Sequence, residues 1–382
     1  MNIYLIYHKL FDFDGKELTI GGIQTYLLNL AKVLLDNDMK PFIYQLANEP
    51  WMFNYNGIEI RGVKKLQTNN SLKQSKLLLN EVLKVADKES DLVIWGTDTL
   101  AVKTDKIKTL AIQHGIGFDY IAHSLSIFPW LKKFSLQPLY KFLQRRKSIS
   151  SFLRAEHKVC VDYNYLNWIR TMVAREHLNN ITVIPNFTHI NNRKSINQID
   201  NTEIKILFAR RFTEERGVFI LMDIIDVILE KYKNIRFTIA GEGKYEPMLR
   251  KKFASNSSRV AITKFDHSDS LEIHSNHHIA LIPTYGSEGT SLSLLEAMTS
   301  GCVPIASNVG GMTNIVLDGY NGFLVDPTAE SFIEKISFLI GNFEAIQQIS
   351  YNAKLSADSA FCYAEWANKW ANVTNKIEKK NE

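Results

Sequence analysis

Cysteine is scarce in this sequence, and its distribution excludes two kinds of stabilising site. The 382 residues include 3 cysteines, Cys160, Cys302 and Cys362. Because they are odd in number, far apart and without C-x-x-C spacing, neither a disulfide framework nor a zinc site is expected. This usage favours a reducing compartment, the cytoplasm.

Long apolar runs are missing as well. No charge-free apolar stretch approaches the roughly 20 residues that cross a bilayer, and residues 1–7 lack the basic region and apolar core of a signal peptide. We therefore expect a protein that is neither secreted nor membrane-spanning. An apolar fraction of 45% and a charged fraction of 22% are typical of a globular protein, and the length predicts two domains.

Acidic residues are absent from one segment of the chain. No Asp or Glu occurs between Tyr120 and Ala155, whereas Lys and Arg contribute seven positive charges there, more than the formal net charge of +5 of the whole chain. The excess is therefore a local basic face. Because the chain as a whole is only mildly basic, no nucleic-acid partner is expected.

Both halves of the sequence begin with the same plan of strand, glycine turn and helix. Residues 2–7 have the character of a buried strand, Gly21 and Gly22 follow, and apolar residues recur at helical spacing over 23–35. The second half repeats this plan with a strand at 204–209, Gly217 and a helix over 218–229. Further strand-like runs lie at 236–240, 260–263, 279–283 and 303–306. This alternation predicts an α/β fold with parallel sheets covered by helices on both faces.

The boundary between the two domains is predicted in the Asn-rich stretch 187–202, whose polar composition suits a hinge. We assign residues 1–187 to an N-terminal α/β domain and residues 188–358 to a C-terminal one. Residues 359–382 contain two tryptophans and predict an aromatic helix that must pack on another element.

The most informative segment is 287–298, in which Glu288 and Glu296 bracket a glycine and small hydroxyl residues between two apolar runs. It follows the strand-like 279–283 and opens a helix, whose first backbone N–H groups attract anions. With a helix that starts near Thr290, Glu296 lies roughly 9 Å along it, about a nucleoside's reach from a bound phosphate. Both carboxylates could instead lie on a loop and a helix surface, but Glu296 interrupts an apolar run and needs a partner.

Two arginines, Arg211 and Arg216, flank the turn after the strand at 204–209. Ligands of open α/β sheets bind at the carboxyl ends of the strands, and two guanidiniums there suit a diphosphate. A solvated turn, in which each arginine pairs with a neighbouring Glu, explains the pattern equally well. Arg210 is expected to point elsewhere, because adjacent residues of a strand alternate in direction.

Histidines supply two further patterns. His114 follows the probable strand 108–112 beside two glycines, where it could reach a substrate hydroxyl or be a core histidine bonded to backbone. His274, His277 and His278 invite a metal site but lack a suitable cluster of acidic partners, so ordinary surface histidines are expected there.

Together these residues resemble the retaining glycosyltransferases of family 4, which have the GT-B fold. The segment 288–298 looks like the family's E-x7-E motif and continues through 300–311. Further matches lie at 183–186, 207–217, 239–243 and 319–325, and the first half matches more loosely at 21–24 and 113–115. The resemblance implies two Rossmann-like domains that face each other across a deep cleft, with the C-terminal helix crossing back to the N-terminal domain.

The resemblance also implies roles for individual residues. Arg211 and Arg216 would grip the diphosphate of a nucleotide-sugar donor, Glu296 would bind ribose hydroxyls, Glu288 would orient the sugar, and His114 would touch it from the first domain. The expected catalytic set is therefore Glu288, His114, Arg211 and Arg216. The other expected donor-binding residues are Gly21, Gly22, Gly289, Thr290, Ser291, Leu292 and Glu296. A UDP- or GDP-type sugar is the implied co-substrate, and no metal or other cofactor is expected.

The basic segment 128–154 resembles a membrane-surface element, because aromatic residues adjoin its cations. An ordinary core helix with a solvated basic face is the alternative. With membrane contact, we expect transfer of a hexose to a lipid-linked saccharide in capsule, O-antigen or other lipopolysaccharide biosynthesis, at the inner face of the cytoplasmic membrane. A nucleotide-sugar epimerase or hydrolase of similar fold, and a non-catalytic sugar-nucleotide or glycan-binding partner, remain as alternatives.

Overall fold

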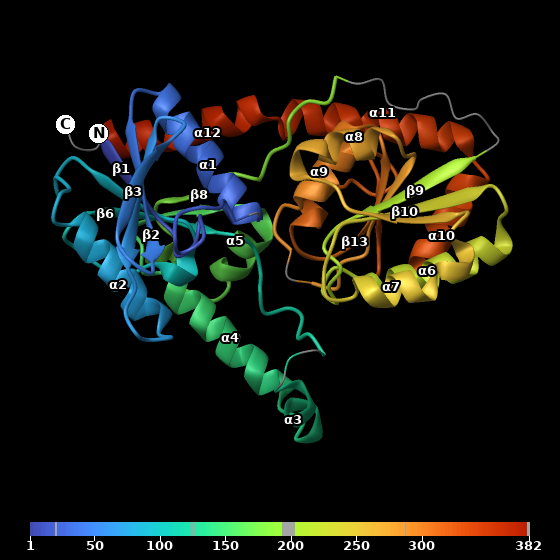
Figure 1. Ribbon diagram of the computed structural model, residues 1–382, viewed down its shortest axis with the longest axis horizontal. Helices are drawn as coiled ribbons and strands as arrows, with labels where there is room; N and C mark the ends of the chain where they lie inside the picture. The colour runs from blue at the N-terminus through green and yellow to red at the C-terminus, as the bar shows by residue number, and fades with distance from the viewer. Residues whose placement is uncertain (20, 124, 126, 193–202, 287, 380–382) are drawn as a thin grey trace. The chain divides into compact units, whose positions relative to one another are not determined.

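The computed structural model describes the chain except residues 20, 124, 126, 193–202, 287 and 380–382 (Figure 1). Its contacts group the residues into two compact units. Unit 1 comprises Met1–His114, Phe142–Pro185 and Ala364–Glu382, and unit 2 comprises Gly115–Lys141 and Asn186–Tyr363. Most of the Asn-rich stretch expected as a hinge lies outside the described residues. The division at 187/188 and 358/359 stays a prediction.

Unit 1 is built on an eight-stranded sheet with the strand order β3-β4-β2-β1-β5-β6-β7-β8. Its strands are β1 (Asn2–Ile6), β2 (Lys40–Ala47), β3 (Trp51–Tyr55), β4 (Ile58–Lys64), β5 (Leu92–Trp95), β6 (Lys108–Gln113), β7 (His157–Cys160) and β8 (Ile181–Val183). All neighbours are parallel except β3 and β4, which form an antiparallel pair at one edge. Every residue of β5 is buried, as expected of a central parallel strand covered on both faces.

The helices of unit 1 are α1 (Gly22–Asp36), α2 (Ser71–Val82), α5 (Tyr163–Arg170), most of α4 (Gln137–Phe152) and nearly all of α12 (Tyr363–Lys379). The aromatic helix α12 packs on α1, because Trp366 and Trp370 are buried against the edge of Tyr26. The indole Nε1 of Trp370 also donates to the Tyr26 hydroxyl at 2.9 Å. The expected return of the C-terminal helix to the first unit is confirmed.

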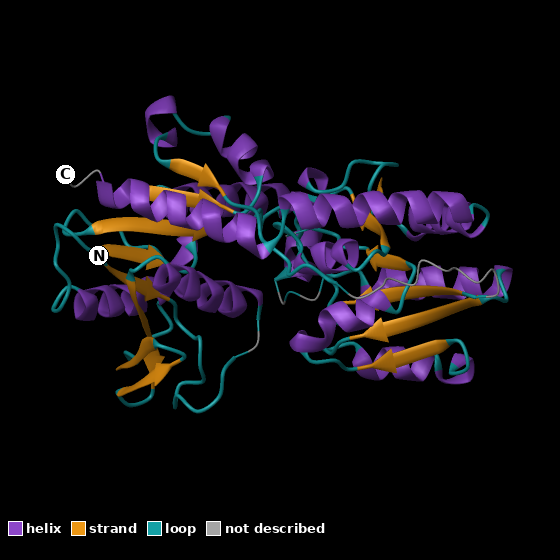
Figure 2. Cartoon of the chain, turned by 90° about the horizontal axis from the view of Figure 1, so that it is seen from above, coloured by secondary structure: helices purple, strands orange, loops and turns teal. Residues whose placement is uncertain are grey.

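Unit 2 holds a six-stranded parallel sheet with the strand order β11-β10-β9-β12-β13-β14. Its strands are β9 (Ile204–Ala209), β10 (Ile235–Ala240), β11 (Val260–Thr263), β12 (Ile279–Ile282), β13 (Val303–Ser307) and β14 (Phe323–Val325). Its helices are α3 (Phe128–Lys133), α6 (Val218–Lys231), α7 (Glu246–Lys252), α8 (Ser270–Ser275), α9 (Leu292–Thr299), α10 (Ala329–Ile340) and α11 (Phe343–Ala360). Figure 2 shows helices on both sides of this sheet. The predicted parallel α/β architecture is confirmed.

Alternation along β12 explains the two cores of unit 2. Ile279 and Leu281 point into the core beneath α6 and α10, whereas Ala280 and Ile282 point into the core beneath α9 and α11. A strand buried on both faces must be apolar at every position, which is why its sequence reads as one continuous run. The same run made this strand predictable.

The strand order of unit 2 indicates at which edge of the sheet a ligand would bind. The chain proceeds outward from β9 through β10 to β11, and then returns to the other side of β9 with β12. Loops that leave β9 and β12 therefore diverge at the carboxyl ends of two neighbouring strands, which is where open α/β sheets bind ligands.

At Gly217, the turn that follows β9 packs directly on the end of β12. The φ of this glycine, +79°, is left-handed, and a Cβ there would lie 1.7 Å from the carbonyl oxygen of Pro283. Only glycine therefore lets α6 begin directly against the end of β12. Among the described residues, no helix has the length and apolar character needed to cross a membrane.

Candidate functional site

Two arginines and a glutamate converge at this edge of unit 2. Arg210 follows β9, Arg216 ends the same turn just before α6, and Glu288 follows β12. A guanidinium nitrogen of Arg210 donates to the Glu288 carboxylate at 2.8 Å, and Arg216 forms an ion pair with the same oxygen atom. The other terminal nitrogen of Arg210 donates to the hydroxyl of Thr284 at 2.6 Å. The loops after two neighbouring strands thus build one polar cluster.

The cluster is buried and has an excess of positive charge. Glu288 is 8% exposed and Arg210 is 9% exposed. Burial lowers the pKa of Arg210 and of Arg216 to about 9, and the neighbouring arginines act in the same direction. Both guanidiniums therefore remain charged at neutral pH. Two cations face one carboxylate, so the cluster can accept a further anion, and guanidiniums bind phosphate oxygens in pairs.

The structure places two adjacent arginines differently from the expectation, while their roles stay a prediction. Arg211 was expected inside the site and Arg210 outside it, but Arg210 is buried against Glu288 whereas Arg211 is exposed. The strand alternation used for this expectation stops at Ala209, where β9 ends. Arg216, the other arginine expected in the site, lies beside Glu288.

The start of α9 lies next to Glu288. The helix begins at Leu292 with Ser291 as its N-cap residue, two residues later than predicted. Among the described residues, the Ser291 side chain makes no capping hydrogen bond to the helix start. The backbone N–H groups of the first turn, which begins at Leu292, therefore supply the positive end of a helix dipole beside the two arginines.

Glycines hold this loop in place. The N–H of Gly311 donates to the carbonyl oxygen of Glu288 at 3.1 Å. A Cβ on Gly310, which has a φ of +55°, would lie 2.1 Å from that oxygen, and one on Gly115 would lie 2.7 Å from the Cα of Gly289. On its far side, the carbonyl of Thr290 accepts from the Asn186 amide at 2.7 Å. Close backbone packing thus fixes the loop that carries Glu288.

Glu296 lies on the face of α9 that is turned toward α8. Its carboxylate accepts from the hydroxyl of Ser270 at 2.7 Å, and it lies close enough to His274 to favour the charged form of that ring. Glu296 is partly exposed, whereas its apolar neighbours Leu295 and Ala297 are buried. The Glu296 carboxylate, which interrupts this apolar run, therefore has a hydrogen-bond partner and is partly accessible to solvent.

The remaining expected site residues belong to unit 1. Gly21 precedes α1 in an extended conformation and Gly22 is its first residue. His114 follows β6, and its Nε2 lies 2.8 Å from the carbonyl oxygen of Gly96. Since a carbonyl only accepts, Nε2 carries the proton and Nδ1 is left as an acceptor. Burial lowers the pKa of His114 to about 4, so the ring is neutral at pH 7.

The histidines near β12 differ from the expectation of surface residues. His274, His277 and His278 are all buried. The Nδ1 of His277 lies 2.7 Å from the carbonyl oxygen of Ile273, and its Nε2 lies 2.7 Å from the hydroxyl of Thr238. Within the described part of the chain, no group of three or more His, Cys, Asp or Glu could hold a metal ion. These rings therefore serve as hydrogen-bonded core residues.

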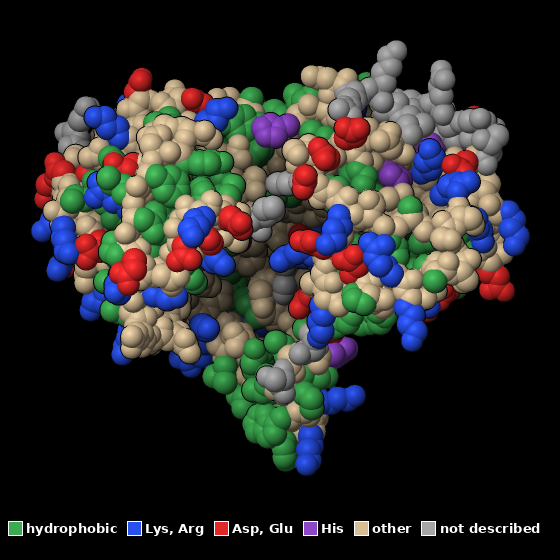
Figure 3. All heavy atoms as spheres, viewed as in Figure 1, with side chains coloured by type: hydrophobic (Ala, Val, Ile, Leu, Met, Phe, Trp, Pro, Cys, Tyr) green, Lys and Arg blue, Asp and Glu red, His purple; other side chains and the backbone are tan. Residues whose placement is uncertain are grey.

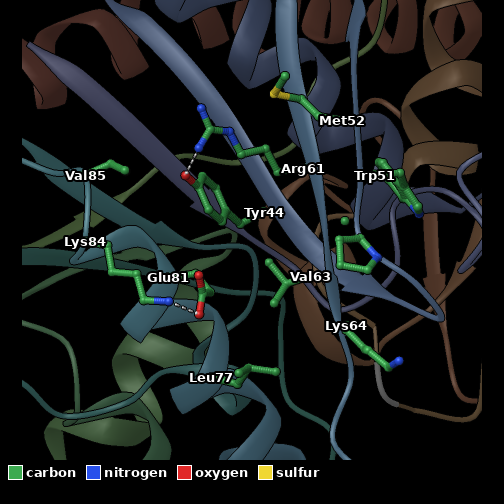
Figure 4. A pocket seen from close by; sticks show the side chains of 12 residues that line it. Tyr44, Trp51, Met52, Arg61, Val63, Lys64, Leu77, Glu81, Lys84 and Val85 are labelled. Carbon is green, nitrogen blue, oxygen red and sulfur yellow. Dashed lines mark hydrogen bonds and ion pairs between the residues drawn. The ribbon is translucent and has the colours of Figure 1, made fainter.

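A separate pocket in unit 1 differs from this cluster in its charge. It has a volume of about 600 Å³ and lies between α2 and the edge strands, with Tyr44 and Trp51 in its wall (Figure 4). Its three cations are each paired with a carboxylate: Arg61 with Glu59, Lys64 with Glu49 and Lys84 with Glu81. The pocket has no charge left for an anion, in contrast to the arginine cluster of unit 2.

Comparison with known proteins relates the second half of the chain to one protein family. Residues 190–356 match the model of the family described as "Glycosyl transferases group 1". Lipopolysaccharide 1,2-N-acetylglucosaminetransferase of Salmonella typhimurium is 24% identical over 201 residues, which cover 49% of this chain and 50% of that protein. The chain spans about half the length of the curated relatives it matches.

Solved structures with low sequence identity share the whole fold. Sucrose-phosphate synthase of Thermosynechococcus elongatus has a TM-score of 0.76 at 14% identity and covers 99% of each chain. Anabaena HepE in complex with UDP has a TM-score of 0.72 at 17% identity and covers 98% of this chain and 100% of that one. The expected GT-B fold class is confirmed. A cleft between facing domains stays a prediction.

Proposed function

Because residues 190–356 match the model of the group 1 glycosyl transferases, we propose that the chain transfers a hexose from a nucleoside-diphosphate sugar to a saccharide acceptor. The observation that carries this proposal is the buried cluster of Arg210, Arg216 and Glu288 beside the start of α9. It combines excess positive charge with helix N–H groups at the strand ends where such folds bind nucleotides.

The donor would lie along the carboxyl edge of unit 2. Arg210 and Arg216 would bind the diphosphate together with the N–H groups of 289–292. Glu288 would hold both guanidiniums in place and would also accept a hydrogen bond from a hydroxyl of the sugar. The partly exposed carboxylate of Glu296 would bind the ribose hydroxyls, since it lies further along α9. Arg211, which is exposed, would contribute positive charge without a fixed contact.

The reaction would break the bond between the anomeric carbon and the diphosphate oxygen. The acceptor hydroxyl oxygen forms the new bond to that carbon on the same face, and its proton passes to the departing phosphate, so that the donor's configuration is retained. Negative charge develops on the leaving diphosphate, where two fixed guanidiniums and the helix start stabilise it in a buried site. These groups would perform the task without a metal ion.

His114 would contact the transferred sugar. Its neutral ring has a bare Nδ1, because Nε2 is committed to the carbonyl oxygen of Gly96. Nδ1 can therefore accept a hydrogen bond from a sugar hydroxyl, and the lowered pKa of His114 keeps this acceptor available across physiological pH. Gly21 and Gly22 would leave room for the sugar at the start of α1.

Uridine is the nucleoside we propose for the donor. HepE, which shares the whole fold, has been solved with UDP. A lipopolysaccharide transferase among the relatives supports a saccharide acceptor in cell-surface polysaccharide or lipopolysaccharide biosynthesis. A lipid-linked acceptor belongs to the same proposal.

A peripheral contact with an anionic membrane through residues 128–154 is part of the same proposal. Figure 3 shows hydrophobic side chains gathered with Lys and Arg over α3. Trp130 is 52% exposed and Phe134 is 51% exposed, beside the exposed Lys132 and Lys133. Further along α4, in unit 1, exposed apolar residues are again followed by exposed cations. Apolar insertion next to basic side chains is how interfacial helices bind acidic lipid.

A binding screen followed by a product assay tests the proposed reaction. UDP-, GDP- and dTDP-sugars are added in a thermal-shift experiment, and a donor at 100 times its Kd should stabilise the protein by about 2.7 kcal/mol. The stabilising donor is then incubated with and without saccharide acceptors. Transfer product supports the proposal, whereas free sugar or epimer without acceptor indicates the hydrolase or epimerase. If none of the three donors stabilises the protein, the proposed glycosyl transfer is contradicted.

A further inference from the structure

A short segment of unit 2 binds the turn that carries the site arginines. This segment, residues 119–123, is here called the strap. The phenol oxygen of Tyr120 donates to the Glu214 carboxylate at 2.5 Å, and the backbone N–H of His123 donates to the same oxygen at 2.8 Å. The His123 ring nitrogen Nδ1 lies 3.1 Å from it. Glu214, in the middle of the arginine turn, thus has three contacts with the strap.

The strap also packs on the loop that leads to Glu288. The rings of Tyr120 and Tyr285 stack with centroids 5.2 Å apart and an angle of 9° between their planes. A Cβ on Gly286 would lie 2.7 Å from the Cβ of Tyr120, so the backbone approaches the strap as closely as glycine allows. The N–H of Tyr285 in turn donates to the carbonyl oxygen of Glu215. The strap therefore touches both loops that build the donor site.

The carboxylate that accepts these contacts is buried, whereas the His123 side chain is 69% exposed. Glu214 is 3% exposed, and a carboxylate taken out of water depends on its hydrogen-bond donors. Burial, together with Glu214, raises the pKa of Tyr120, so its hydroxyl remains a donor at every physiological pH. Removal of one strap donor should therefore loosen Glu214 and the turn on either side of it.

At its other end the strap is connected to the exposed apolar surface. The His123 ring packs on Phe128, the first residue of α3, with centroids 4.5 Å apart. The ammonium of Lys141 on α4 donates to the carbonyl oxygen of Asp119 at 2.6 Å. Both ends of the strap are thus bound to the helices proposed to meet lipid.

We propose that Tyr120, His123 and Glu214 are positioning residues that link membrane contact at α3 to the geometry of the arginine turn. The proposal deepens the glycosyltransferase assignment and rests on it for the identity of the donor. When α3 is held in a bilayer, the strap holds Glu214, and Arg210 and Arg216 on either side of it are kept in the donor-binding arrangement. Linkage is reciprocal, so donor binding must strengthen membrane binding by the same factor.

The test compares wild type with Tyr120→Phe, which removes the phenol oxygen but keeps the ring on Tyr285. Tyr351→Phe is the matched control, because Tyr351 is 66% exposed on α11. The Kd for UDP is measured by calorimetry without vesicles, with phosphatidylcholine vesicles and with vesicles containing phosphatidylglycerol. Amide hydrogen exchange of residues 210–217 is measured under the same conditions, and this second readout needs no nucleotide.

Anionic vesicles should tighten UDP binding by at least about fivefold in wild type and in the control, as is typical of coupled sites. They should also slow exchange in residues 210–217. Tyr120→Phe should still bind UDP and vesicles, but vesicles should change neither its Kd nor its exchange.

Two results would overturn the inference: vesicles that leave Kd and exchange unchanged in wild type, or full coupling in Tyr120→Phe. If wild type binds no vesicles, the inference about the strap is wrong as well, but the proposed transfer reaction is not contradicted. Wild type that binds no UDP contradicts the proposed donor, and the exchange measurement then decides the link between the strap and the arginine turn.

Discussion

At the scale of single residues, packing decides which of three arginines enters the polar cluster. The sequence places three arginines within seven positions, and each could reach a ligand at the end of β9. Only the packing of the turn decides among them. Arg210 points to Glu288 and Thr284, Arg216 reaches the same carboxylate from the other side, and Arg211 is exposed. The two buried guanidiniums hold a fixed geometry without a ligand, and this preorganisation would lower the cost of binding the proposed donor.

This arrangement predicts unequal effects of two conservative substitutions. Arg210→Lys should weaken UDP binding by about tenfold, about 1.4 kcal/mol, because an ammonium cannot span Glu288, Thr284 and a phosphate oxygen as the guanidinium fork does. Arg211→Lys should change the affinity by less than about threefold, since it keeps a solvated charge. Calorimetric titration with UDP measures both. If Arg211→Lys were the weaker binder, the site would have to be rebuilt around Arg211.

At the scale of elements, the short helix α8 shows how burial makes stability depend on pH. It follows β11 and precedes β12, and the rings of His274 and His277 are buried where it ends. The Nδ1 of His277 lies against the carbonyl oxygen of Ile273 and must carry a proton, so Nε2 accepts from the Thr238 hydroxyl. Protonation of Nε2 would break the contact with Thr238 and place a charge in the core.

Acid should therefore destabilise unit 2 through this ring. Burial lowers the pKa of His277 from 6.5 to about 4, so the unfolded chain binds the proton more readily than the folded one. The stabilisation is present above pH 6.5 and is lost as the pH falls toward 4. Within this window, each proton that the chain takes up on unfolding lowers the free energy of unfolding by about 1.4 kcal/mol for every pH unit of acidification.

Denaturant unfolding at several pH values between 7.5 and 4 measures this effect. His277→Gln keeps a donor and an acceptor but cannot be protonated, so its stability should fall less steeply with acid. His177→Gln, at an exposed position, is the control and should follow wild type. Equal slopes for His277→Gln and wild type would show that other groups cause the acid sensitivity.

At the scale of the whole molecule, contacts that are distant in sequence join the pieces of each unit. The indole of Trp370 donates to the hydroxyl of Tyr26, 344 positions away. Helix α4 is divided between the units, with its first residues in unit 2 and the rest in unit 1. The basic and apolar residues of 128–154 are therefore distributed over both units.

Reversal of charge on α4 tests the proposed membrane contact. Arg145, Arg146 and Lys147 are exposed, and each basic residue near an acidic surface contributes about 1 kcal/mol. The triple change of these residues to Glu should lower binding to phosphatidylglycerol vesicles by at least about 100-fold in a sedimentation assay.

The matched control reverses three exposed lysines elsewhere in unit 1, Lys88, Lys103 and Lys106, and makes the same change in net charge. This control should keep most of the binding of wild type. Equal loss in both variants would indicate a general charge effect, and unchanged binding of the α4 variant would contradict the membrane proposal.

The sequence by itself determined several strands of unit 2 and singled out the segment 287–298. The predicted runs at 204–209, 236–240 and 260–263 agree with β9, β10 and β11 to within one residue, because apolar residues dominate these strands. The 287–298 segment was identifiable because two carboxylates, a glycine and a helix start are all local features. Local patterns of this kind can be recognised in the sequence without knowledge of the tertiary structure.

Tertiary structure alone decided which side chains meet. The direction of Arg210, the burial of His277 and the contact of Tyr120 with Glu214, 94 positions apart, depend on packing between elements. The antiparallel pair of β3 and β4 also lay outside the parallel pattern expected. Periodicity specifies which face of an element is apolar, but the partner of a polar side chain is set by loop geometry and by residues far along the chain.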